Sequence, residues 1–196
     1  MKNISILAVA LCAALAFSSC EREKHFLKEG AYREQVSAQF EKRKAEVWHR
    51  SRALFSVFEK EGLSLAQREA LQFLYAYMPL CDLADYDGAF FLNQIDAAFN
   101  ARDYFLWGKT IPDDIFRHFV LVYRINNEYL DTARTVFFEE LKERVKNLSM
   151  YEAALEVNHW CHEKVTYRGT DSRTSAPLAL VKTSWGRCGE ESTFTT

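Results

Sequence analysis

Apolar residues recur every three or four positions along most of this chain, and few helix-breaking residues interrupt them. In residues 26–61 the repeat is carried by Val36, Phe40, Val47, Leu54 and Phe58. Lys, Arg and Glu occupy the other faces, and the 196 residues include 7 Gly and 3 Pro. Because this spacing is typical of amphipathic helices, the sequence predicts a mainly α-helical fold. Residues 26–61 are expected to form one helix that ends at Gly62.

Further helices are predicted from their start and stop signals. Ser64 and Gln67 have the spacing of a capping box, so a second helix is expected to begin there and to end at Pro79. Residues 80–88 contain three Asp and are predicted to form a loop. A third helix then ends near Phe105.

The second half of the chain continues this pattern. Pro112 suits the first turn of a helix, and residues 120–125 either continue that helix or form a short strand. After a turn at Asn126 and Asn127, apolar residues line another helix, which Asn147 can close.

The clearest capping box lies at Ser149 and Glu152 and predicts one further helix, which carries His159, Cys161 and His162. A metal site is not expected on this helix. Positions 159 and 161 point about 200° apart around a helix, and the two histidines lack a third ligand nearby. Core packing is predicted for Cys161.

Charge and composition argue against nucleic acids and metals as partners. The net charge is −2 with both signs interspersed, so the basic patch that nucleic-acid binding needs is missing. The acids Asp82, Asp85 and Asp87 resemble a calcium loop only loosely, because the glutamate that completes such loops is absent. No metal and no cofactor is expected.

The first 20 residues have the features of an export signal. Lys2 supplies the positive start, residues 4–17 the apolar core, and a small-residue cleavage site precedes Cys20. This site resembles a bacterial lipobox, which implies removal of residues 1–19 and lipidation of Cys20. The product would be exported and anchored by lipid to a bacterial cell membrane, in the periplasm or at the cell surface. An ordinary cleaved signal peptide is the alternative, because Phe17 replaces the usual Leu.

The C-terminal residues indicate a reactive thiol. Cys188 lies between Gly186 and Gly189 and is followed by Glu190 and Glu191. A cysteine at the start of a helix is close to the positive end of the helix dipole and to unpaired N–H groups, both of which favour the thiolate. The glycines lack the Cβ atoms that would keep a substrate backbone away from the sulfur. These residues predict a nucleophile, and a buried structural cysteine is the alternative.

Residues 186–192 resemble the cysteine motif of the transglutaminase-like superfamily, whose papain-like fold uses Cys, His and Asp in that chain order. The end of a helix with a tyrosine, a loop and a small apolar helix precede the family's cysteine, and residues 165–167, 169–174 and 176–181 match them. The resemblance is confined to the C-terminal part of the chain. It implies that Cys188 attacks an amide or peptide carbonyl to form a thioester, and that its backbone N–H contributes to an oxyanion hole.

The resemblance divides the chain into three parts. Residues 1–19 are the lipoprotein signal peptide, residues 20–147 a helical N-terminal domain, and residues 148–196 the first part of a transglutaminase-like domain, whose complete core would be α+β. The family's histidine and aspartate follow the cysteine helix, whereas residues 189–196 contain neither residue type. We therefore expect the 196-residue chain to be catalytically inactive by itself.

The implied function is a thiol enzyme that acts on an amide of a peptide, protein or cell-wall-like substrate, with hydrolysis expected ahead of cross-linking. Trp185 either lines the substrate cleft together with Gly186 and Gly189 or packs under the cysteine helix. The alternative function is a non-enzymatic surface lipoprotein whose degenerate transglutaminase-like core is a binding or scaffolding module.

Two further expectations concern side-chain contacts. Cys81 and Cys161 are not expected to form a disulfide, since nothing in the sequence brings them together. Without the strands that would cover the cysteine helix, Trp185 and Phe194 are expected to expose apolar surface.

Overall fold

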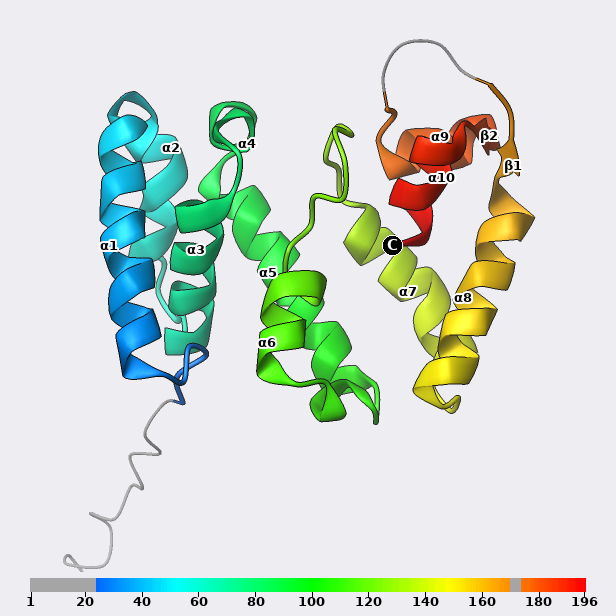
Figure 1. Ribbon diagram of the computed structural model, residues 1–196, viewed down its shortest axis with the longest axis horizontal. Helices are drawn as coiled ribbons and strands as arrows, with labels where there is room; N and C mark the ends of the chain where they lie inside the picture. Colours follow the sequence, from blue (N-terminus) through cyan, green and yellow to red (C-terminus); the bar gives the residue numbers. More distant parts are fainter. Residues whose placement is uncertain (1–23, 170–173) are drawn as a thin grey trace, which may run out of the picture.

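The computed structural model describes residues 24–169 and 174–196 of the chain. Most of these residues are helical and the described strands form one two-stranded sheet, which confirms the predicted mainly α-helical class. In Figure 1 the chain runs from one end of an elongated molecule, in blue, to the other end, in orange and red. No helix within the described ranges is both long and apolar enough to cross a membrane.

The prediction of a single helix over residues 26–61 is wrong, because the chain turns after Val47. The segment consists of four elements: α1 (Gly30–Glu46), a 3₁₀ turn (Trp48–Arg50), α2 (Ser51–Phe55) and a second 3₁₀ turn (Ser56–Glu59). The buried residues Val36 and Phe40 come from α1, and Leu54 and Val57 come from the later elements. A straight helix would carry the second pair away from the core, whereas the turn lets both pairs join one hydrophobic cluster.

Two predicted helix starts are confirmed by their side-chain caps. In α3 (Leu65–Tyr77) the Gln67 N–H donates to the Ser64 hydroxyl at 3.2 Å, and the Gln67 side chain accepts from the Ser64 N–H at 2.9 Å. Ser149 and Glu152 form the same pair of bonds, at 3.3 and 2.9 Å, at the start of α8 (Met150–Lys164). Because a capping box satisfies its donors locally, the sequence alone is enough to locate these helix ends.

Helix α4 (Leu80–Asp85) replaces the loop predicted for residues 80–88, so that prediction is wrong. Asp82 points inward from α4, and its fully buried carboxylate bonds to the guanidinium of Arg124, 42 positions further along the chain. This partner cannot be recognised from local spacing. Helix α5 (Gly88–Tyr104) follows directly, and the Asp87 carboxylate caps it by accepting the N–H of Phe90 at 2.9 Å.

Residues 105–132 connect α5 to α7 (Ala133–Val145). They include a 3₁₀ turn (Gly108–Thr110), α6 (Asp113–Ile115) and a π-helical turn (Phe116–Val120). Residues 121–132 then form an irregular loop without a strand, called the connecting loop below. The helical path therefore ends at Val120, and neither a longer helix nor a strand forms over residues 120–125.

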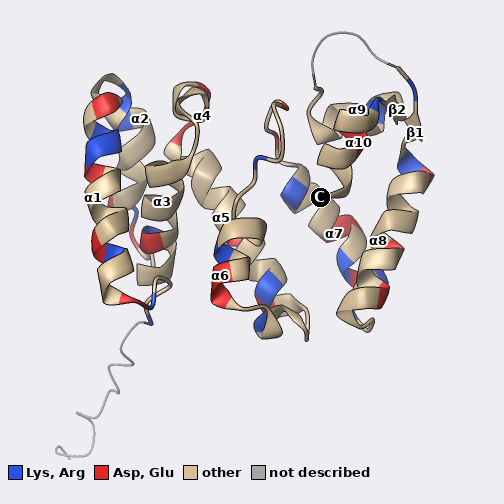
Figure 2. Cartoon of the chain, viewed as in Figure 1, with Lys and Arg blue, Asp and Glu red and all other residues tan. Residues whose placement is uncertain are grey.

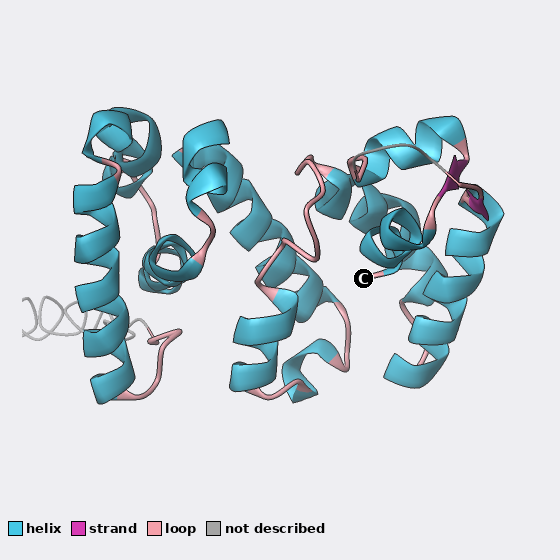
Figure 3. Ribbon diagram, turned by 45° about the horizontal axis from the view of Figure 1, so that its top comes forward, coloured by secondary structure: helices cyan, strands magenta, loops and turns pink. Residues whose placement is uncertain are grey.

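The C-terminal elements alternate between strand and helix: β1 (Thr166–Tyr167), α9 (Pro177–Thr183), β2 (Trp185–Gly186) and α10 (Cys188–Thr195). The strands run parallel, with Thr166 opposite Trp185 and Tyr167 opposite Gly186. Figure 3 shows this short ladder, in magenta, near the end of α8. Ser184, with a left-handed φ of 59°, turns the chain from α9 into β2.

Helix α7 packs into two hydrophobic clusters. Phe137 and Leu141 pack against buried Trp160 and Phe194, whereas Phe138 joins a cluster around Phe105. The predicted boundary at residue 147 lies between α7 and α8, which pack on one another. Acidic and basic residues are spread along the helices (Figure 2), so charge does not divide the molecule into two regions.

Candidate functional site

Cys188 is the first residue of α10, as predicted, and it is exposed. Arg187 before it is extended, with φ −83° and ψ 171°. The N–H groups of Cys188 and Gly189 lie in the first turn, where a helix offers no acceptor. In the part of the chain that the structure describes, neither N–H donates a hydrogen bond. The exposed thiol and two available donors therefore share one turn.

Glu190 holds the cysteine turn in place from inside the protein. It is 3% exposed, and its carboxylate accepts the N–H of Ser175 at 2.9 Å and the N–H of Arg187 at 3.0 Å. The sequence suggested only that an acid suits this helix start. The structure shows that Glu190 fixes the residue before Cys188 to the segment that leads into α9.

The two glycines around Cys188 have different surroundings. A Cβ at Gly186 would lie 2.5 Å from the Leu180 side chain and 3.1 Å from the Glu190 Cβ, so the protein itself fills that space. A Cβ at Gly189 would lie 3.5 Å from the Asn126 amide nitrogen, which is an ordinary contact. Close packing thus explains Gly186, and Gly189 is the glycine that leaves room next to the thiol.

Trp185 lies on β2 and is 37% exposed. The guanidinium of Arg168, which follows β1, stacks over its indole ring at 4.5 Å from the centroid. Such a cation–π contact fixes the ring against the strand pair at the molecular surface.

The connecting loop lies against the cysteine turn. The Asp131 carboxylate accepts the N–H of Leu178 in α9 at 2.9 Å and also the N–H of Ala133 at the start of α7 at 2.8 Å. The Thr174 hydroxyl donates to the Asn127 side chain at 2.6 Å. The bonds to Leu178 and Thr174 tie the loop to the segment that precedes the cysteine motif.

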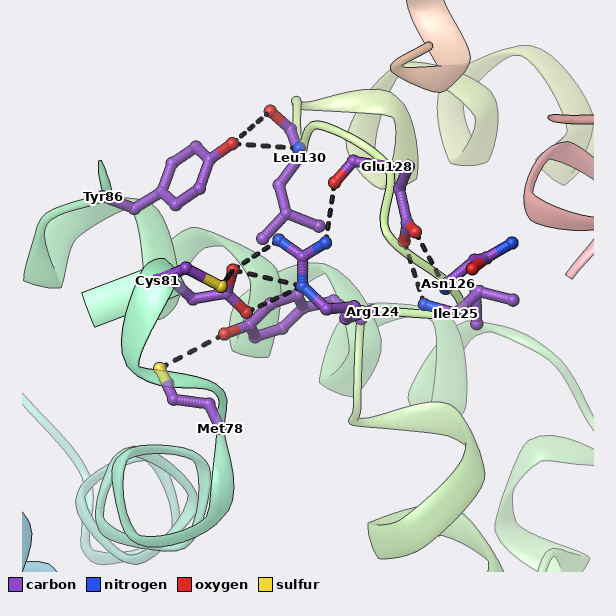
Figure 4. A network of polar contacts seen from close by, with 10 residues as sticks. Met78, Cys81, Tyr86, Arg124, Ile125, Asn126, Glu128 and Leu130 are labelled. Carbon is purple, nitrogen blue, oxygen red and sulfur yellow. Dashed lines mark hydrogen bonds and ion pairs between the residues drawn. The ribbon is translucent and has the colours of Figure 1, made fainter. Parts of the chain in front are cut away.

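An ion pair between the half-buried Arg124 and the fully buried carboxylate of Asp82 anchors the connecting loop to α4 (Figure 4). The guanidinium of Arg124 forms two hydrogen bonds from Nε to Asp82, at 2.9 and 3.1 Å, and donates to the Glu128 carbonyl at 2.7 Å. The Glu128 carboxylate accepts the N–H groups of Ile125 and Asn126 at 2.9 and 2.8 Å. The sequence singled out neither Arg124 nor Glu128, and it pointed to Asp82 only through a loose resemblance to a calcium loop.

None of the other described cysteines and histidines forms a bond with the candidate nucleophile. Cys81, Cys161 and Cys188 are all free thiols. Cys161 is buried, as predicted, and burial raises the pKa of its thiol to about 11. His159 pairs with Glu163 at 3.2 Å on the exposed side of α8. Over residues 24–169 and 174–196, no side chain hydrogen-bonds to the Cys188 thiol, and no group of three potential ligands could hold a metal ion.

Phe194 is buried, so the expectation that it exposes apolar surface is wrong. Its ring lies 5.3 Å from Trp160 and 5.4 Å from Phe137. Trp160 itself donates from its indole N–H to Glu140 at 3.1 Å. Helices α7 and α8 thus cover the face of α10 that was expected to be open.

Two cavities lie between helices of the molecule, and Cys188 lines neither. One of about 360 Å³ lies among α5, α7 and the end of α10, with Phe137, Leu141 and Phe194 in its wall. The other, of about 480 Å³, lies between α1, α3 and the connecting loop, with Tyr32 and Phe73 in its wall. Cys20, the predicted lipidation site, lies outside the described residues.

Comparison with known proteins finds no match: no family model, no curated protein and no solved structure is significantly similar to this chain.

Proposed function

We propose that the chain carries the nucleophile of a transglutaminase-like thiol enzyme, and that Cys188 attacks the substrate. The observation that supports this most is the exposed thiol at the first residue of α10, next to two N–H groups without an acceptor in the described ranges. Nucleophilic acyl transfer needs a sulfur and oxyanion donors on the same side of a carbonyl group. The turn at Cys188 and Gly189 has both.

The proposed reaction proceeds through a thioester. The Cys188 sulfur bonds to the carbonyl carbon of an amide, the carbon–nitrogen bond breaks, and the leaving amine takes up a proton. Water then attacks the thioester, which releases a carboxylic acid and returns the thiol. In the net reaction, an amide of a peptide, protein or cell-wall-like substrate reacts with water to give a carboxylic acid and an amine. An amine in place of water would give a cross-link instead.

Both steps need a base that is itself oriented by a third group. No described side chain hydrogen-bonds to the Cys188 thiol, and His159 is engaged by Glu163. The resemblance implies a histidine and an aspartate after the cysteine helix.

The proposed location is outside the cell, with the protein attached to a bacterial membrane by lipid on Cys20. This part of the proposal depends on the sequence of residues 1–20, which has a short apolar core followed by a cleavage site and a cysteine.

A second candidate is a non-enzymatic binding module. The cavity of about 360 Å³ among α5, α7 and α10 favours it, because an apolar cavity of this size can bind a small ligand. In this case ligand binding would not depend on the sulfur of Cys188.

The test compares amide hydrolysis and amine incorporation by the full-length protein and by two variants, Cys188→Ala and Cys81→Ala. Cys81 is the matched control, since it is also an exposed thiol. We expect Cys188→Ala to abolish turnover and Cys81→Ala to preserve it. Unchanged turnover in Cys188→Ala would refute the proposal that Cys188 is the nucleophile of an enzyme. Turnover by the 196-residue chain that is lost in Cys188→Ala would show that its base lies within these residues.

A further inference from the structure

A basic hollow of about 730 Å³ lies between the α2 region and the start of α5. In Figure 1, α2 lies toward the end of the molecule opposite α10, the helix that Cys188 begins. His49 and Arg50 line it from the first 3₁₀ turn, Arg52 from α2, and Lys60 from the end of the second 3₁₀ turn. Asp87, the cap of α5, is the acidic residue in its wall. Three permanent positive charges therefore share this hollow with one negative charge.

The positive charge of the basic hollow is not neutralised by the protein around it. Arg52 and Lys60 are exposed and have no hydrogen bond or ion pair within the described ranges. The Asp87 carboxylate is already engaged as an acceptor for the Phe90 N–H. By contrast, Arg43 and Lys44 on the neighbouring α1 are paired with glutamates on their own helix.

The Arg50 side chain is held in place by a hydrogen bond, but not all of its N–H donors have an acceptor. Its guanidinium donates to the Tyr86 carbonyl at 2.7 Å, which fixes the side chain against the start of α5. Its Nε–H is buried and has no acceptor in the part of the chain that the structure describes. The bond to Tyr86 therefore orients the guanidinium of Arg50 at the wall of the hollow.

Neutral donors lie alongside the cations. The Ser56 hydroxyl and the Asn93 amide line the same hollow, and neither has a hydrogen-bond partner among the described residues. The wall also includes the first turn of the 17-residue helix α5, whose dipole favours an anion. Cations, neutral donors and a helix start thus converge on one open space.

We propose that the basic hollow binds the phosphate group of a phosphate-bearing molecule. A phosphate monoester carries up to two negative charges and several acceptor oxygens, which matches three cations and two neutral donors better than a single carboxylate would. The volume leaves room for the molecule that carries the phosphate. Extended nucleic acid does not fit, because the hollow is an isolated patch on a chain of net charge −2.

The first test is a titration of the purified protein with inorganic phosphate and pyrophosphate, followed by amide NMR shifts. Arg52→Gln and Lys60→Gln each remove one exposed cation and should leave folding intact, which circular dichroism checks. Each should weaken binding by about tenfold or more, because one charge-assisted hydrogen bond is lost. Lys42→Gln and Lys182→Gln remove the same charge outside the hollow and should leave the Kd unchanged.

A second arm identifies the source of the phosphate. Vesicles of phosphatidylcholine with and without phosphatidic acid are sedimented with the protein, in the presence and absence of pyrophosphate. Binding to phosphatidic acid that pyrophosphate and Arg52→Gln both abolish assigns a lipid headgroup, and binding of soluble phosphate alone assigns a soluble ligand. The proposal is overturned if phosphate leaves the resonances of Ser56 and Asn93 unmoved, or if all four variants bind equally.

Discussion

Glu190 accepts a hydrogen bond from the backbone of Ser175, 15 positions earlier in the chain, at 2.9 Å. The same buried carboxylate holds the N–H of Arg187, next to Cys188. Glu190→Ala should therefore lower the free energy of unfolding by about 2 kcal/mol, because two backbone donors lose a charged partner. Urea denaturation measures this loss. Glu191→Ala, on the same helix turn, is the control and should have little effect, and equal losses in both variants would contradict the role given to Glu190.

Asp82 and Arg124 form the buried pair that holds the connecting loop. Asp82→Ala leaves Arg124 without its carboxylate and should cost about 3 kcal/mol, as expected when one partner of a buried ion pair is removed. The exposed Asp85 lies on the same helix, and Asp85→Ala should change stability by less than about 0.5 kcal/mol. Thermal and urea unfolding of the two variants provide the comparison, and a small loss in Asp82→Ala would show that the pair does not anchor the loop.

Asp113, the first residue of α6, pairs with Lys28 and Arg102, which both come earlier in the chain. Hydrogen bonds from Lys28 and then from Arg102 hold the pKa of its carboxyl below the usual value. The stability that it contributes is therefore present above the pKa of the unfolded carboxyl, about 4, and is lost as the pH falls through the lower folded pKa. Because the carboxylate is 33% exposed, the contribution should stay under about 1 kcal/mol.

The measurement for Asp113 is urea unfolding at pH 7 and at pH 2. Asp113→Asn should be less stable than the wild type at pH 7, and the difference should shrink as the pH falls toward 2. Asp114→Asn removes the neighbouring charge and should show no such pH dependence. If the stability deficit of Asp113→Asn were as large at pH 2 as at pH 7, an electrostatic origin would be contradicted.

Cys161 should resist alkylation in the folded protein. Burial raises the pKa of its thiol to about 11, so roughly one thiol in a thousand is ionised at pH 8. With iodoacetamide at pH 8, peptide mapping should find Cys81 and Cys188 modified well before Cys161. Urea should remove the protection. Rapid modification of Cys161 without urea would show that its helix face is open.

Local signals predicted the parts of the fold whose partners are close in the sequence. The capping boxes at Ser64 and Ser149 are of this kind, since donor and acceptor lie three residues apart. The same is true of the start of α10 at Cys188. Helix α4 was missed because the partner of Asp82 is 42 residues away.

The candidate site, like the fold, was predicted only where the relevant residues are close together in the sequence. The exposed cysteine at a helix start follows from a few adjacent residues. The need for glycine at position 186 could not be predicted from adjacent residues, because it depends on close contacts with the side chains of Leu180 and Glu190. The burial of Phe194 also depends on distant residues, since α7 and α8 cover it. An acid two positions after a cysteine is a local signal that could have pointed to Glu190.

The most direct measurement of the central claim is the formation of a thioester on Cys188. The protein is incubated with an activated ester as acyl donor, and tryptic peptides are examined by mass spectrometry before and after hydroxylamine, which cleaves thioesters. This first half of the reaction needs an accessible nucleophile but no leaving-group acid, so it is informative whatever the turnover rate. We expect a hydroxylamine-sensitive acyl group on Cys188 and much less on Cys81, the other exposed thiol. Equal acylation of the two cysteines, or acylation of Cys81 alone, would contradict the claim that Cys188 is the nucleophile.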